Sequence, residues 1–291
     1  MMPLITGQLI ASQIHPNVVD WYKRVILNGG AAPSPQTMAA VNTFYGDLIT
    51  YQLDGLMHNV NCFVPDNLTA ALTPLIKVAG SGSWMNANNQ FSSSDLSING
   101  LKGNGAQGIG GAEYYLVSST KYLKTGYQPC SAGNGLLGLT VYTTTTSSLG
   151  KDNAFFACAP AGYTAGDDAL FGTSTGHRYD NPSWLGRSYI DTGLKIGYLS
   201  GNRTSTTRND IYYANSTTAH TAGTANTSTY NQFTHTLELW VFAMNYPNNA
   251  SFPSDIRLSF CACHNALTTA KSVLFYTAIQ RMRQNIGGGW V

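Results

Sequence analysis

The chain has 291 residues, of which 43% are hydrophobic and only 10% are charged, and its formal net charge is +2. A chain of this length and apolar content can bury a substantial core, so we predict a folded protein and not a disordered one. The low net charge excludes the basic surface typical of nucleic-acid binding and also an acidic tail, so no nucleic-acid partner is expected.

No segment reaches the roughly 20 consecutive apolar residues that a membrane-spanning helix requires. The first eleven residues also lack the basic start of a signal peptide, so we expect synthesis in the cytoplasm and free, mostly buried thiols. The five cysteines are Cys62, Cys130, Cys158, Cys261 and Cys263. Cys261 and Cys263 should point to one side of a strand and His264 to the other, which is a weak pattern for a metal site.

Residues 1–57 predict a hairpin of two helices, which we assign as an N-terminal unit for anchoring or oligomerisation. Pro16 occupies a natural first-turn position, and the first helical pattern stops at Asn28-Gly29-Gly30. Ser34-Pro35 then repeats the start signal. A hairpin of this size is too small to be stable alone, so it is expected to pack on the rest of the chain or on a neighbouring subunit.

From residue 58 onward the sequence predicts short strands separated by glycine-rich and polar turns. The expected strand segments are 60–64, 98–105, 121–127, 136–144, 153–158, 189–199, 211–214, 237–242 and 257–263, with 98–105 and 121–127 forming a strand–turn–strand unit. The polar tract 215–231 fits either a long hairpin or a disordered loop. Many short strands without intervening helices predict an antiparallel sandwich or barrel.

The last predicted element is an amphipathic helix that begins after Thr268, a good N-cap residue. Leu274, Ala278, Met282 and Ile286 recur every four residues on one face, and residues 287–289 are glycines that end the helix. Because a short amphipathic helix needs an apolar surface to cover, we expect it to lie on the sandwich.

The order of these elements resembles tailed-phage virion structural proteins that carry a concanavalin A-like (laminin-G-type) jelly roll. The matching segments are Gly29-Gly30, AAVNTFYGDL at 39–48, GLKGNG at 100–105, KYLKTGY at 121–127, GYLSGNR at 197–203, and the closing strand and helix at 257–287. The resemblance implies a mainly β fold, with residues 58–291 forming the jelly roll and its C-terminal helix.

The same resemblance implies a non-enzymatic component of the virion, in a tail fibre, a baseplate or a capsid decoration, with other virion proteins as partners. It also implies location in the virion and a role in host attachment. A one-sided helical hairpin and a weakly charged surface suit packing against identical copies, so we expect a homo-oligomer and, within that class, a trimer.

The sequence offers no pair of catalytic carboxylates. Glycan hydrolases with this fold place Glu-x-Asp-x-x-Glu on one strand, because hydrolysis needs an acid and a nucleophile side by side. This chain has two glutamates, Glu113 and Glu238, and neither has a partner at that spacing. We therefore predict no catalytic residues, and a glycan-degrading enzyme ranks last among three functional hypotheses.

The densest polar cluster in the sequence predicts a carbohydrate-binding site, which gives the second hypothesis, a lectin-like module for host-surface glycans. Its candidate residues are His177, Tyr179, Asp180 and Trp184, whose rings and polar groups suit stacking and hydrogen bonding to sugars. No cofactor is expected. Calcium held by Asp167, Asp168 and Asp180 is the alternative, and a polar turn between strands explains the same residues without any ligand.

Overall fold

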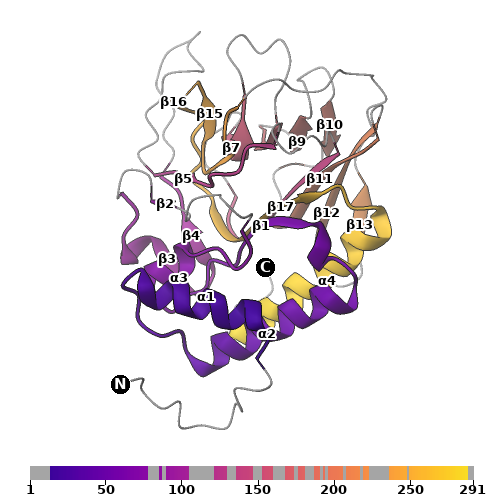
Figure 1. Cartoon of the computed structure of the whole chain (residues 1–291). Helices are drawn as coiled ribbons and strands as arrows, with labels where there is room; N and C mark the ends of the chain where they lie inside the picture. The colour runs from indigo at the N-terminus through magenta and orange to yellow at the C-terminus, as the bar shows by residue number, and fades with distance from the viewer. Residues whose placement is uncertain are drawn as a thin grey trace.

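Two β-sheets lie face to face, and helices cover the outer face of one of them (Figure 1). The structure is a computed structural model of the whole chain. It describes residues 14–77, 85–86, 90–104, 121–129, 136–146, 153–159, 168–173, 176–180, 187–190, 193, 196–205, 208–216, 219–222, 236–247 and 249–287.

Sheet A is the sheet that carries the helices, and its neighbouring strands pair antiparallel. In spatial order it consists of β13 (Ala219–Ala222), β12 (Arg208–Ser216), β11 (Gly197–Ser205), β6 (Leu137–Thr143), β17 (Arg257–Asn265), β4 (Gly100–Lys102) and β3 (Leu96–Ser97), with β1 (Met57–Asn61) also paired to β17.

Sheet B forms the other layer. Its strands, in spatial order, are β10 (Arg187–Ile190), β9 (His177–Asp180), β8 (Asp168–Gly172), β7 (Asn153–Cys158), β14 (Trp240–Val241), β5 (Leu123–Lys124) and β2 (Met85–Asn86). At one end β15 (Met244–Tyr246) runs parallel to β7 and pairs antiparallel with β16 (Asn249–Ser251).

The helices begin and end at the signals that the sequence carries. They are α1 (Pro16–Leu27), α2 (Pro35–Thr50), α3 (Leu68–Leu72) and α4 (Thr269–Ile286), with short 3-10 turns η2 (Asp54–Leu56) and η3 (Ser93–Asp95). The side chains of Ser34 and Thr268 cap α2 and α4, and Gly287 ends α4 with a φ of 92°. In the described part of the chain, no helix is long and apolar enough to cross a membrane.

Sheet A separates two hydrophobic cores, because successive residues of a strand face opposite sides. On β17, Phe260 and Ala262 pack with α1, α2 and α4, whereas Cys261 and Cys263 pack between the two sheets. The cysteines among the described residues are free and buried, as expected, and Cys130 lies outside those residues. The helical hairpin therefore packs on sheet A of the same chain.

The predicted antiparallel sandwich, with helices before it and one helix after it, is confirmed. One expected unit is wrong: β4 of segment 98–105 lies in sheet A and β5 of segment 121–127 lies in sheet B, so the two are not paired. The segment 237–242 yields the short strand β14, because Phe242, with a φ of 68°, turns the chain there. The first part of the polar tract forms a hairpin of β12 and β13, and residues 223–235 lie outside the described residues.

Candidate ligand-binding surface

Two of the predicted sugar-binding residues point into the space between the sheets. Tyr179 on β9 is completely buried, and its hydroxyl donates to the Leu137 carbonyl oxygen at 2.9 Å. Its ring fills the space beside Gly201, where an added Cβ would lie 2.1 Å from Tyr179 Cγ. His177, 2% exposed, has its ring centroid 6.2 Å from that of Tyr213 on sheet A. Both side chains therefore belong to the interior of the sandwich.

Asp180 lies on the other face of sheet B. It pairs in register with Ala169, and it forms an ion pair with Arg178, with Nε and Oδ2 2.9 Å apart. Asp180 is 1% exposed. The structure thus does not bring Asp180 together with His177 and Tyr179.

The remaining predicted residues leave the calcium alternative open. Trp184 and Asp167 lie outside the described residues, and Asp168 is described only as the first residue of β8. Within the described ranges, no group of three or more His, Cys, Asp and Glu side chains is arranged to hold a metal ion. Glu113 also lies outside these ranges.

Glu238 is held by hydrogen bonds on both of its carboxylate oxygens. The backbone N–H of Gly126 donates to Oε2 at 2.7 Å, and the indole N–H of Trp240 donates to Oε1 at 3.1 Å. The side-chain amide of Asn245 donates to the backbone carbonyl oxygen of Glu238 at 3.0 Å. These contacts fix the carboxylate beside the Trp240 ring and join two segments that are distant in the sequence.

Trp240 carries an aromatic stack on the outer face of sheet B. Its neighbour Val241 points into the core between the sheets, so Trp240 points outward. The Tyr122 ring lies over it with centroids 4.4 Å apart and planes 15° apart, and Lys124 Nζ is 5.2 Å from the Trp240 centroid. Trp240 is 1% exposed, whereas Tyr122, Lys124 and Glu238 are half-buried. We call these three half-buried residues the Tyr122 surface.

The Tyr122 surface combines an aromatic ring with groups of both charges. Burial raises the pKa of Tyr122, and the negative charge of Glu238 raises it further, so the phenol stays protonated at neutral pH and can donate a hydrogen bond. A half-buried ring stacked on Trp240, together with a fixed carboxylate and an ammonium group around the same tryptophan, has the chemistry of a sugar-binding site. The local sequence pattern does not reveal this site, because Tyr122 and Trp240 meet only through the pairing of β5 with β14.

Replacing Glu238 by Gln is expected to lower the free energy of unfolding by about 1 kcal/mol, because a Gln side chain has one acceptor oxygen for two N–H donors. Urea denaturation at pH 7 measures the change. Asp54→Asn, at an exposed position on η2, is the matched control and should stay within about 0.5 kcal/mol of wild type. Equal losses in both variants would contradict the assigned contacts.

No protein-family model matches the chain, and no curated protein matches it. Among solved structures it is distantly similar to the CBM40 of Ruminococcus gnavus IT-sialidase bound to α2,3-sialyllactose, with 7% identity, a TM-score of 0.36, and coverage of 48% of this chain and 80% of that chain. A leech intramolecular trans-sialidase complexed with 2,7-anhydro-Neu5Ac matches with 7% identity and a TM-score of 0.34, over 67% of this chain and 26% of that chain. The NanB sialidase of Streptococcus pneumoniae matches with 10% identity and a TM-score of 0.32, over 46% of this chain and 23% of that chain.

Proposed function

We propose that the protein is a non-catalytic glycan-binding β-sandwich whose ligand lies against the Tyr122 surface. The observation that carries the proposal is the Tyr122–Trp240 stack, with ring planes 15° apart, on the face of sheet B that points away from the helices. Trp240 is buried and supports the stack from below, so Tyr122 is the ring that a ligand contacts.

The groups around Tyr122 match the two kinds of contact that a sugar ring makes. The apolar face of a sugar packs on an aromatic ring, and its hydroxyl groups exchange hydrogen bonds with charged side chains. Lys124 offers only donors, and the carboxylate of Glu238 offers only acceptors. Because Glu238 is already fixed by Gly126 and Trp240, it needs little reordering when a ligand binds.

Tyr122→Ala is expected to weaken glycan binding at least about tenfold, because the variant loses both the stacking contact and the apolar area of the ring. An array of sialylated and neutral glycans would identify the ligand for the wild-type chain. Isothermal titration calorimetry with that ligand would then compare the variants.

The matched control is Tyr22→Ala, which removes a half-buried tyrosine from α1 on the opposite side of the molecule. It should bind the glycan as wild type does. If no glycan on the array binds the wild-type chain, or if both variants bind equally well, the proposed site is wrong.

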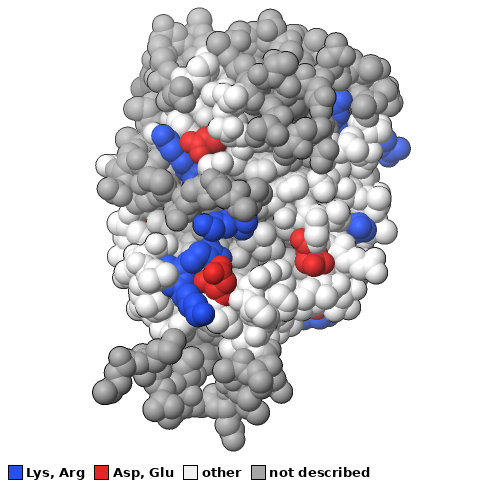
Figure 2. Space-filling model, viewed as in Figure 1, with Lys and Arg blue, Asp and Glu red and all other residues white. Residues whose placement is uncertain are grey.

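Display of this surface on a virion is compatible with glycan binding and rests on the sequence resemblance alone. Figure 2 shows that Lys and Arg side chains gather beside an acidic side chain on one part of the visible face, and that the rest of its described area carries few charges. A weakly charged area suits contact with other protein subunits. The virion location, the host-attachment role and the trimer stay predictions, and a map of the intact particle with this chain placed in it would test all three.

A further inference from the structure

Two Asn-Gly pairs that the structure describes completely have almost the same local sequence. They are Leu27-Asn28-Gly29 and Ile98-Asn99-Gly100, each with an aliphatic residue in front. An asparagine side chain can react with the backbone nitrogen of a following glycine, because glycine has no Cβ to hinder the approach. Since the two pairs share this chemistry, a difference in their reactivity must come from the fold.

The reaction at such a pair is deamidation, and it needs only water. The backbone nitrogen of Gly29 attacks Cγ of Asn28, and the new C–N bond closes a five-membered succinimide ring. The side-chain nitrogen leaves as ammonia and takes the proton of the Gly29 N–H. Water then opens the ring at one of its two C–N bonds, which leaves aspartate or isoaspartate at position 28 and adds one negative charge.

The surroundings of Asn28 permit this reaction. Asn28 is the C-cap residue of α1, both Asn28 and Gly29 are exposed, and Leu27 before them is 83% exposed. No described residue other than its chain neighbours lies within 4 Å of a Cβ added to Gly29. The Gly29 N–H donates to the Ile26 carbonyl oxygen at 3.0 Å, so the last turn of α1 must open before the nitrogen can attack. Helix ends open at a low cost in free energy, so the reactive state is accessible.

The second pair lies in the turn between β3 and β4, and other segments hold its backbone. The hydroxyl of Thr144 donates to the Asn99 carbonyl oxygen at 2.8 Å, and the Arg257 guanidinium donates to the Gly100 carbonyl oxygen. A Cβ added to Gly100 would lie 2.0 Å from the Leu258 carbonyl oxygen, so this turn runs directly against β17.

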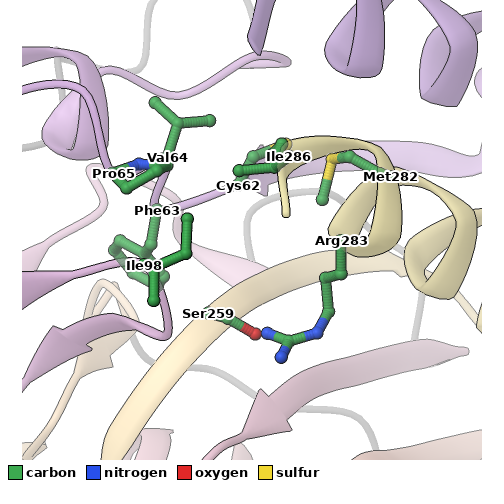
Figure 3. A pocket seen from close by; sticks show the side chains of 9 residues that line it. All are labelled: Cys62, Phe63, Val64, Pro65, Ile98, Ser259, Met282, Arg283 and Ile286. Carbon is green, nitrogen blue, oxygen red and sulfur yellow. The ribbon is translucent and has the colours of Figure 1, made fainter. Parts of the chain in front are cut away.

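The side chain of Ile98, directly before Asn99, packs against the same part of the fold. It lines a narrow space together with Phe63 and Ser259, between β17 and the last turn of α4 (Figure 3). Ile98 is 45% exposed, about half the exposure of Leu27. Attack at Asn99 therefore requires a turn to leave β17, which costs more free energy than opening one helix end.

We propose that Asn28 is a site of spontaneous deamidation in the folded protein and that the fold protects Asn99. The product places a carboxylate at the carbonyl end of α1, where the helix dipole disfavours negative charge. Isoaspartate also lengthens the main chain just before Gly30, whose N–H donates to the Val25 carbonyl oxygen at 3.0 Å. A Cβ added to Gly30 would lie 2.8 Å from Thr69 Cβ, so the main chain has no room to shift towards α3. Deamidation therefore loosens the end of α1.

The test incubates the full-length folded protein at about pH 8 and about 37 °C, and follows the peptides that contain Asn28 and Asn99 by digestion and mass spectrometry. The expected result is that Asn28 converts at least about tenfold faster than Asn99, which corresponds to a difference of about 1.4 kcal/mol in the free energy of opening. The control is the same incubation in about 8 M urea, where the two sites should convert at rates within about twofold of each other because the fold is absent.

Equal conversion of Asn28 and Asn99 in the folded protein, or no conversion of Asn28, would overturn the proposal. So would a tenfold difference that persists in urea, because it would assign the difference to local sequence and not to the fold. Each of these results would leave glycan binding at the Tyr122 surface unaffected.

Discussion

Tyr179→Ala is expected to lower the free energy of unfolding by about 3–5 kcal/mol, as for other large-to-small substitutions of buried aromatic residues. Tyr179 is completely buried between the sheets and packs directly against Gly201. Its removal leaves a cavity that the backbone of β11 cannot fill, and it strips the Leu137 carbonyl oxygen of its 2.9 Å hydrogen bond. Urea denaturation followed by circular dichroism measures the loss.

Two comparisons separate this structural role from the sugar contact that the sequence suggested for Tyr179. Tyr179→Phe keeps the ring and should cost only about 1 kcal/mol, the typical value of one hydrogen bond. Tyr246→Ala, at a half-buried position on β15 of sheet B, should cost clearly less than Tyr179→Ala. A Tyr179→Ala variant that keeps wild-type stability but loses glycan binding would place Tyr179 in a ligand site.

The sequence predicts those parts of the fold that depend on neighbouring residues. The Thr268 hydroxyl accepts from the Lys271 N–H at 3.3 Å, and Gly287 adopts the left-handed conformation that ends α4, as the local pattern indicates. The alternation along β17 is also local, and it correctly places Cys261 and Cys263 on one side and His264 on the other.

Strand pairing and the candidate site depend on contacts between distant segments, which the local pattern does not contain. Segments 98–105 and 121–127 look like one unit, yet they belong to different sheets. The strand His177–Asp180 looks like an exposed polar loop because three of its four residues are charged or imidazole-bearing. It is buried in the sandwich, where Arg178 and Asp180 form an ion pair and the His177 ring packs against the Tyr213 ring.

The residues around Glu238 also come together only through contacts between distant segments. Glu238 has no acidic neighbour within the segment 237–242, so the sequence gives it no partner. In the fold its partners are two N–H groups, one from Gly126 and one from Trp240. Only the pairing of β5 with β14 brings Tyr122 and Lys124 to the side of Trp240. That pairing involves two residues on each strand.

The protein is expected to lose stability as the pH falls below about 6.5, because His264 must stay neutral in the folded state. His264 is completely buried between sheet A and α4, and its ring centroid lies 5.6 Å from that of Phe275. Its Nδ1 is 2.8 Å from the Asn265 carbonyl oxygen, which only accepts, so Nδ1 carries the proton. Nε2, the nitrogen without a proton in this tautomer, is 2.8 Å from the Thr140 hydroxyl oxygen.

Burial is the main cause that lowers the pKa of His264, from 6.5 to about 4, and the nearby His58 lowers it slightly. A histidine whose folded pKa is depressed contributes its full stability above the unfolded pKa. That contribution is lost as the unfolded chain takes up a proton and the folded chain does not. The expected loss is about 2 kcal/mol by pH 5 and about 3 kcal/mol by pH 4.

His264→Gln isolates this contribution from that of the carboxylates. Asp95 has a lowered pKa and Asp47 a raised one, so both also change stability in acid, in opposite directions. Subtracting the unfolding free energies of His264→Gln from those of wild type at each pH cancels both carboxylates. The difference should shrink by about 2 kcal/mol between pH 7.5 and pH 5, because only wild type carries the buried imidazole. A difference that stays constant over this range would mean that the folded protein accommodates a charged imidazole at position 264, and that the layer between sheet A and α4 is open to water.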